Sequence, residues 1–243
     1  MQLKWFVLTW ISLISGSTWA QADSVTPRAI VSLGYGFGSP IDQLKNRYGS
    51  FGMLHVATIY RSRKWEIGPS INYFFGSTVK EDVLSIYRTK EGDLIGSDHQ
   101  LAQVDLRMRG IFMGITLKKL FKINPSNIIC LGLQPGWFAH WIRFQDQGNT
   151  FEPILGSNRY GYDRMSAGLG LTQSLAYRYA SPNRLINFEI EIGLTEACTS
   201  LRRNLQLDLP LKTFKSSSDG LFFITAKWLI PIFSRKNPDE IYY

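Results

Sequence analysis

Residues 161–194 read GYDRMSAGLGLTQSLAYRYASPNRLINFEIEIGL and alternate between apolar and small or polar side chains on both sides of a turn at 181–183. This period of two predicts β-strands. The two faces of the first half are Met165, Ala167, Leu169, Leu171 and Leu175 against Ser166, Gly168, Gly170, Thr172 and Ser174. A soluble sheet buries its apolar face, but a face of glycine, serine and threonine could not build a core. We therefore expect the apolar face on the outside.

Eight segments show strand character. They are residues 28–38, 50–60, 64–76, 101–117, 127–144, the two halves of 161–194, and 220–233. Short turns at 61–63, 118–126 and 181–183 alternate with long loops around 39–49, 77–100, 145–163 and 201–219. An even number of strands joined in this way is typical of outer-membrane barrels. The sequence predicts an all-β fold, an eight-stranded antiparallel up-and-down transmembrane β-barrel with both chain ends in the periplasm; a soluble β-sandwich is the alternative.

The first residues have the layout of an export signal. Lys4 precedes an apolar run at residues 5–14, and small residues end at Ala22. This layout predicts a cleavable signal peptide at 1–22 and a barrel domain at 23–243; an N-terminal anchor is the alternative. No later segment approaches the ~18 apolar residues of a membrane-spanning helix.

Cysteine and proline positions add two expectations. Cys130 and Cys198 fall near opposite ends of the expected barrel, too far apart for a disulfide, which needs Cα atoms within roughly 7 Å. Pro69, Pro135 and Pro231 fall inside expected strands, where proline removes a ladder hydrogen bond.

The aromatic residues form two groups. They are Tyr60, Trp65, Tyr177 and Tyr179 by the short turns, and Tyr73, Phe75, Trp137 and Trp141 towards the loops. Two aromatic bands suit the two interfaces of a membrane.

Over residues 28–235 this pattern resembles the small eight-stranded outer-membrane barrels of the OmpA and OmpX type. The stretches GYDRMSAGLGLTQSLAYRYASPNRLINF, FQDQGNTF and DEIYY also look like small barrels common in Bacteroidota, of the PorG and PorT kind. The resemblance implies an outer-membrane location, and membership of a secretion or envelope-assembly machine as one role.

Interior positions carry charges of both signs. An eight-stranded barrel is just wide enough for side chains to fill. The residues that we place inside are Asp105, Arg107, Arg109, Asn187, Glu189, Glu191 and Lys227. Because an unpaired buried charge is very costly, we expect Arg107 and Arg109 to pair with the two glutamates and to plug the lumen. A proton or ion path is the alternative.

The chain is basic, with 27 Lys and Arg against 19 Asp and Glu and a net charge of +8. The excess gathers at the expected periplasmic end, as a basic rim of Arg61, Arg63, Lys64, Lys118, Lys119, Lys122, Arg184, Arg235 and Lys236. Such a rim attracts anionic groups. The expected partners are outer-membrane lipids or a protein with an acidic face, and not nucleic acid.

Catalysis is the competing hypothesis, since some barrels of this architecture modify lipid A. An acyl hydrolase needs a serine, a histidine base and an acid. The histidines are His55, His99 and His140, and only His140 lies at a suitable depth, with Asp163 or Ser166 as neighbours. We expect a non-enzymatic structural or complex-forming barrel without metal or cofactor; a lipid A-modifying acyl hydrolase or acyltransferase is the alternative.

Overall fold

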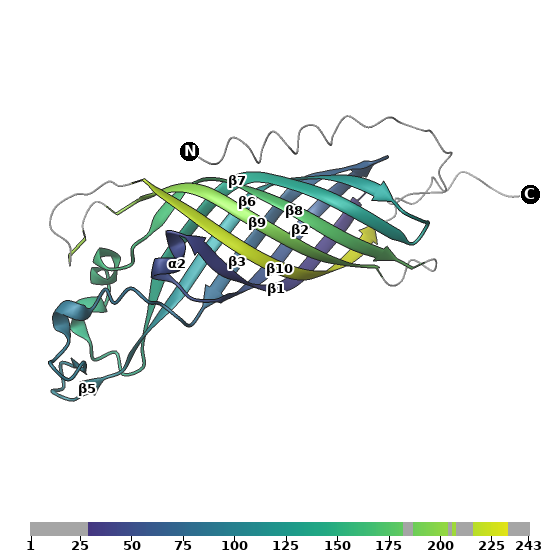
Figure 1. Cartoon of the computed structure of the whole chain (residues 1–243). Helices are drawn as coiled ribbons and strands as arrows, with labels where there is room; N and C mark the ends of the chain where they lie inside the picture. The colour runs from purple at the N-terminus through teal and green to yellow at the C-terminus, as the bar shows by residue number, and fades with distance from the viewer. Residues whose placement is uncertain (1–28, 182–186, 204–205, 208–215, 233–243) are drawn as a thin grey trace, which may run out of the picture.

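A computed structural model describes residues 29–181, 187–203, 206–207 and 216–232. In these residues, eight long antiparallel strands close into a barrel (Figure 1). The strands are β1 (Ala29–Asp42), β2 (Phe51–Ser62), β3 (Trp65–Gly76), β6 (Val104–Lys122), β7 (Asn127–Asp146), β8 (Ser166–Ala180), β9 (Asn187–Leu201) and β10 (Ser217–Ile232). Neighbours in sequence pair throughout, and β1 closes the ring with β10. The predicted up-and-down barrel is confirmed.

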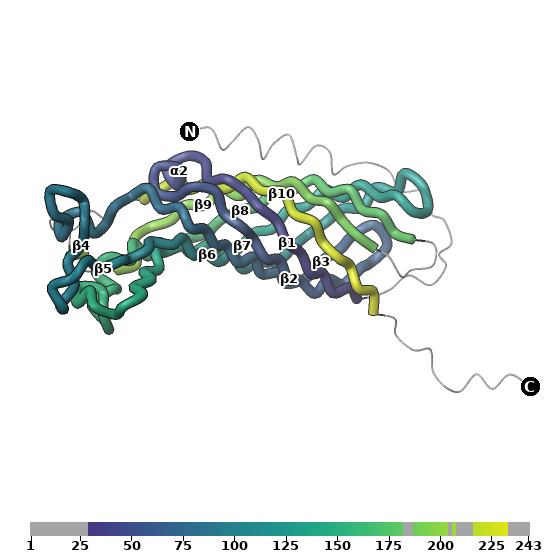
Figure 2. The backbone as a smooth tube through the Cα atoms, turned by 90° about the horizontal axis from the view of Figure 1, so that it is seen from below, coloured from purple at the N-terminus to yellow at the C-terminus, as the bar shows by residue number. Residues whose placement is uncertain are grey.

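The remaining elements are short and lie in the long loops at one end of the barrel, which we call the loop end (Figures 1 and 2). They are α2 (Leu44–Arg47), η1 (Ser85–Tyr87), β4 (Leu94–Ile95), β5 (Leu101–Ala102), η2 (Glu152–Ile154) and η3 (Asn158–Gly161). The opposite end, the turn end, holds the turns at 63–64 and 123–126, the start of β1 and the end of β10. Within the described residues, no helix has the length and apolar character to cross a membrane.

Several strands are longer than the sequence predicted. β1 continues to Asp42 and β9 to Leu201. The predicted turn at 118–126 is wrong in its first half, because residues 118–122 of β6 still pair with residues 128–132 of β7. At the other end, Leu101 and Ala102 pair with β4 rather than joining β6.

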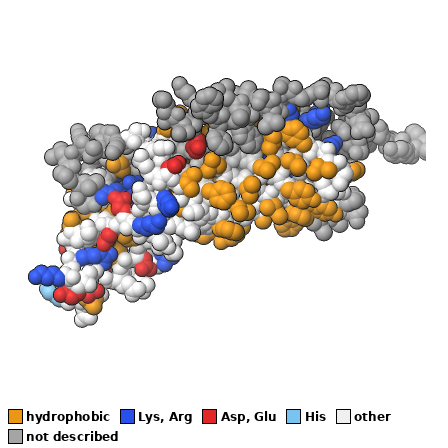
Figure 3. Space-filling model, viewed as in Figure 1, with side chains coloured by type: hydrophobic (Ala, Val, Ile, Leu, Met, Phe, Trp, Pro, Cys, Tyr) orange, Lys and Arg blue, Asp and Glu red, His pale blue; other side chains and the backbone are white. Residues whose placement is uncertain are grey.

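The outer wall is apolar. Its exposed large side chains include Leu33, Tyr35, Phe37, Leu54, Val56, Trp65, Ile67, Ile71, Met113, Ile115, Leu117, Leu175, Ile190, Ile192, Phe222, Trp228 and Ile230. Figure 3 shows this apolar belt over the wall towards the turn end, with charged side chains gathered towards the loop end. A closed barrel leaves no unpaired edge, so a wall of this kind can face lipid.

Two of the prolines coincide with breaks in the hydrogen-bonded ladder. The β2–β3 register passes from Ala57 opposite Ser70 to Tyr60 opposite Ile67, across Pro69. The β6–β7 register is interrupted in the same way across Pro135. These breaks show how strands accommodate a residue that lacks an N–H group.

The two cysteines are both free. Cys130 packs at the turn end with Leu120, Ile128 and Ala176. Cys198 is exposed on β9, towards the loop end.

Candidate functional site

The turn-end half of the lumen is filled by a network of buried charges. Three cations and three anions are each at most 5% exposed: Lys118, Arg178, Lys227, Glu66, Glu189 and Glu191. They come from β3, β6, β8, β9 and β10. Their formal charges cancel, which is the condition under which charges can be buried together.

Arg178 of β8 joins two carboxylates. Its Nη1 and Nη2 donate to the two oxygens of Glu66 at 2.6 and 2.8 Å. Its Nε and Nη2 donate to Oε2 of Glu189 at 2.8 and 2.6 Å. Arg61, at the edge of the lumen, adds a contact of 2.6 Å to Glu66. Bidentate pairs of this kind fix geometry as well as charge.

Two lysines complete the network. Lys118 Nζ lies 2.5 Å from Glu189 Oε1 and 2.6 Å from Glu191 Oε2. Lys227 Nζ lies 2.6 Å from the other oxygen of Glu191. Glycines on the neighbouring strands provide the room: a Cβ on Gly34 would lie 2.8 Å from Lys227 Cγ.

The predicted lumen network is only partly the observed one. Glu189, Glu191, Lys227 and the buried Asn187 do lie inside. Asp105, Arg107 and Arg109 do not: they lie on the outward face of β6, and the predicted arginine–glutamate pairs are wrong. Arg107 instead contacts Asp105 at 3.5 Å, and Arg109 Nη1 donates to the carbonyl oxygen of Met108 at 2.7 Å.

The reason is a change in which face of β6 is apolar. Leu106 and Met108 point inward and pack in the core, whereas Met113, Ile115 and Leu117 point outward and are exposed. Apolar residues therefore line the inside near the loop end and the outside within the belt. The alternation itself keeps one phase along β6, so taking the apolar residues at the start of the strand as its outward face puts the neighbouring charges on the wrong side.

The interior partners that the sequence analysis missed are Glu66, Arg178 and Lys118. Glu66 shares the polar face of β3 with Ser70 and Asn72, which are also buried. Arg178 shares the small-residue face of β8. The signal was therefore present, since Arg178 continues the small-residue face of β8 that was expected to be interior, and Glu66 lies on the polar face of β3. Lys118 could be placed in the lumen only with the knowledge that β6 continues to Lys122.

The loop-end half of the lumen is filled by aromatic and aliphatic side chains. Phe138 lies at the centre of this aromatic plug, with ring centroids 6.0 Å from Phe74 and 6.3 Å from Phe112. The cluster continues into the loops through Leu44, Val83, Leu84, Leu94, Phe151, Ile154 and Tyr162. Charges at one end and rings at the other occupy the lumen of the described barrel.

A buried hydrogen-bonded chain crosses the plug at His140, which is 0% exposed. Its Nδ1 lies 3.2 Å from the Tyr48 hydroxyl and its Nε2 lies 3.0 Å from Asp219 Oδ2. Thr199 donates to the same carboxylate oxygen at 2.5 Å, and Ser217 donates to Oδ1 at 2.7 Å. Both ring nitrogens are thus satisfied, and Asp219 accepts three hydrogen bonds.

This arrangement does not assemble the catalytic set considered from the sequence. Ser166 donates to the backbone oxygen of Arg164 at 3.1 Å, and Asp163 pairs with Arg203 at 2.8 Å. A serine nucleophile needs a histidine base within reach, and both nitrogens of His140 are engaged elsewhere. Among the described residues, no group of His, Cys, Asp or Glu could hold a metal ion.

A second charged cluster holds the loops together outside the barrel wall. Glu81 accepts from Arg47 Nε at 2.6 Å and from Arg164 Nε at 2.8 Å. The backbones of the two loops are joined at the same place, because the Lys80 amide donates to the carbonyl oxygen of Arg47 at 2.8 Å. Burial alone would raise the pKa of the Glu81 carboxyl, but Arg47 and Arg164 outweigh burial and hold that pKa below its usual value.

Glu81→Gln is expected to loosen the 77–100 loop. A hydrogen bond to a charged group contributes ~1.5–3 kcal/mol, so hydrogen exchange at the Lys80 amide should accelerate about tenfold or more. Because the folded-state pKa is depressed, the contribution of Glu81 is present above its unfolded pKa of ~4.3 and is lost as the pH falls below it. In the wild type, acidification should lower the protection factor of the Lys80 amide, which is the exchange rate corrected for the pH dependence of intrinsic exchange. Glu91→Gln, which removes an exposed carboxylate of the same loop, should leave this protection factor nearly unchanged. Unaltered exchange in Glu81→Gln would contradict this role.

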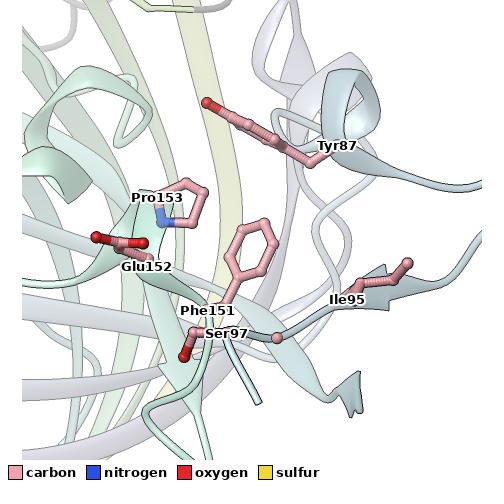
Figure 4. A pocket seen from close by; sticks show the side chains of 7 residues that line it. Tyr87, Ile95, Ser97, Phe151, Glu152 and Pro153 are labelled. Atoms are coloured by element: carbon pink, nitrogen blue, oxygen red, sulfur yellow. The ribbon is translucent and has the colours of Figure 1, made fainter. Parts of the chain in front are cut away.

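One depression lies between the loops, lined by Tyr87, Ile95, Gly96, Ser97, Phe151, Glu152 and Pro153 (Figure 4). Its volume is about 210 Å³. Small-molecule sites are usually ~300–1,000 Å³, so this depression is small for a ligand pocket.

Only part of the predicted basic rim is observed at the turn end. Arg63, Lys64 and Lys122 are exposed at the turn end, and Lys119 lies over the rings of Trp65 and Phe121. Lys118 was wrongly included, because it points into the lumen. Arg61 contacts the interior Glu66. The predicted rim residues Arg184, Arg235 and Lys236 lie outside the described residues.

The sequence matches no family model and no curated protein. Solved structures do match it. Neisserial surface protein A (NspA) has a TM-score of 0.52 and 11% identity, over 86% of this chain and 100% of that chain. The outer membrane protein OprG from Pseudomonas aeruginosa has a TM-score of 0.45 and 14% identity, over 86% of this chain and 99% of that chain. The closed barrel of the described residues and the match to NspA show the fold of the small outer-membrane β-barrels; the resemblance to PorG and PorT stays a prediction.

Proposed function

We propose that this chain is a non-enzymatic outer-membrane barrel that acts as a structural or complex-forming component. The observation that carries this proposal is the filled lumen. Paired charges occupy one half and an aromatic plug the other, which leaves neither a pore nor an open catalytic site among the described residues. The surfaces that remain for function are the two ends and the outer wall.

The orientation in the membrane follows from the unequal connections. Outer-membrane barrels have short periplasmic turns and longer extracellular loops. The turn end, with its connections at 63–64 and 123–126, would face the periplasm, together with both ends of the described barrel. The apolar belt would contact the lipids of the outer membrane.

The turn-end rim would bind an acidic partner protein in the periplasm. Arg63, Lys64 and Lys122 are exposed there, and such contacts act at a range set by salt, ~8 Å at physiological ionic strength. Anionic phospholipid of the inner leaflet would satisfy the same charges, so the test has to separate lipid from protein.

Neutralising the rim with Arg63→Asn, Lys64→Gln and Lys122→Gln is expected to remove a co-purifying protein while the barrel still inserts. Asparagine suits position 63 because φ there is 48°, in the left-handed region that it tolerates. Proteins recovered from membranes in mild detergent would be compared by mass spectrometry, at ~0.15 M and ~1 M salt, where screening shortens to ~3 Å.

The control variant changes Lys45, Lys80 and Lys90 to Gln. It removes the same charge from exposed positions at the loop end and should keep the partner. Exposed charges contribute roughly 0–1 kcal/mol to stability, so both variants should fractionate with the outer membrane and migrate faster on gels when unboiled. An identical set of proteins from the rim variant and the wild type would refute complex formation through this surface.

A further inference from the structure

Three arginines lie side by side on the outer wall at the loop end. Arg107 of β6 and Arg143 of β7 occupy directly opposed positions. Both point outward, because their neighbours Leu106, Met108 and Ile142 pack in the core. Like charges directly opposite each other on a sheet destabilise it.

Arg109, two residues further along β6, lies between aromatic partners. It is opposite Trp141 of β7 and Phe75 of β3. The arginine cluster of Arg107, Arg109 and Arg143 therefore borders an aromatic band.

The charges of the arginine cluster are poorly compensated. Asp105 contacts Arg107 at 3.5 Å, with both side chains more than a third exposed. Among the described residues, Arg109 and Arg143 have no carboxylate within 4 Å, and the buried Nε of Arg107 has no hydrogen-bond partner. The arginine cluster thus has three positive charges against one negative charge, and the buried Nε–H of Arg107 has no acceptor among the described residues.

The arginine cluster lies at one border of the apolar belt. After Arg109, the outward positions of β6 are apolar until Lys119, which follows ten residues later. Ten residues of strand span ~33 Å, and a strand tilt of 35–45° reduces this to ~25 Å along the barrel axis. That is the height of the apolar band of outer-membrane barrels, ~25 Å. Arg109 and Lys119 therefore mark the two levels where lipid headgroups lie.

We propose that Arg107, Arg109 and Arg143 bind the phosphate group of a phosphorylated glycolipid, lipid A, in the outer leaflet. Guanidinium groups bind phosphate oxygens in bidentate fashion, and one phosphate would separate the opposed charges of Arg107 and Arg143. The acyl chains would lie along the belt below, against Ile111 and Met113. This inference rests on the proposed placement of the loop end in the outer leaflet.

The test uses the full-length chain in phosphatidylcholine nanodiscs that contain bis-phosphorylated lipid A. After detergent extraction, the retained lipid A would be measured by native mass spectrometry for the wild type and for R107Q/R109Q/R143Q. A hydrogen bond to a charged group contributes enough for about a tenfold change, so the triple variant should bind lipid A at least about tenfold more weakly. The control variant at Lys45, Lys80 and Lys90 should match the wild type.

R143Q alone, at an exposed position, provides a milder variant whose folding is verified by gel migration without boiling. Equal retention by folded R107Q/R109Q/R143Q or R143Q and wild type would overturn the site. Equal retention of dephosphorylated lipid A, or equal occupancy by inorganic phosphate at the same concentration, would overturn the assignment to a lipid phosphate. Loss of a co-purifying protein with lipid A retention unchanged would assign the face to a protein instead. Failure of the wild type to insert into nanodiscs would refute the proposed membrane placement. Normal insertion with equal lipid A retention by wild type and variant would refute the lipid site alone.

Discussion

Arg178→Met is expected to lower the free energy of unfolding by about 3–5 kcal/mol, the cost of removing one partner from a buried ion pair. Arg178 holds both oxygens of Glu66 and one oxygen of Glu189. Its removal leaves three buried carboxylates with two buried lysines, and Glu66 then depends on Arg61 at the lumen edge. Urea unfolding of the barrel in lipid vesicles would measure the loss.

Glu66→Gln in the same chain should recover part of that stability, because it restores the balance of buried charge. The two changes are in contact, so their effects should not add. Lys64→Met supplies the matched control: it removes an exposed cation one residue before β3 and should change stability by at most ~0.5 kcal/mol. A loss of similar size in Lys64→Met and Arg178→Met would show that the buried network contributes no more to the free energy of unfolding than an exposed charge does.

Phe138→Ala is expected to destabilise the barrel by about 3–5 kcal/mol, as is usual when a buried phenylalanine is truncated. Phe138 is 0% exposed, and its ring contacts Phe74, Phe112 and His140 with centroids 5.4–6.3 Å away. Phe138→Leu keeps much of the volume and should cost less than ~1.5 kcal/mol, as volume-conserving changes do.

Neither Phe138 variant should conduct ions steadily in planar bilayers. The charged network closes the lumen independently at the turn end, through Lys118, Arg178 and Lys227 on one side and three glutamates on the other. Large, stable single-channel conductance of the wild type would contradict a filled lumen. Conductance that appears only in Phe138→Ala would show that the aromatic plug alone closes the lumen.

Strand number and the placement of long and short connections followed from the sequence, because they depend on local signals. Alternation with a period of two is imposed by the pleat of each strand, and the segments in which this alternation stops mark the connections. The same pattern placed Leu169 and Leu175 outside, where the structure exposes them. Glu189, Glu191 and Lys227 were placed inside by the same rule.

The partners inside the barrel could not be predicted in this way. Lys118, Glu191 and Lys227 lie far apart in sequence. They meet only because their strands place these three side chains at the same height inside the lumen. The sequence pattern did not show that β6 continues beyond residue 117 to Lys122. Lys118 was for this reason assigned to a turn, although it points into the lumen.

Each strand carries its own alternating pattern, so the eight-stranded barrel and its apolar outer wall could be derived from the order of the residues. Which charges pair and which stay on the surface depends on the folded barrel. At the loop end the barrel interior continues into the core of the loops, so Leu106 and Met108 turn inward and Arg107 and Arg109 turn outward. The environment of each face changes along the barrel axis, from a charged to an aromatic interior and from an apolar belt to a polar surface, and no local pattern records that change.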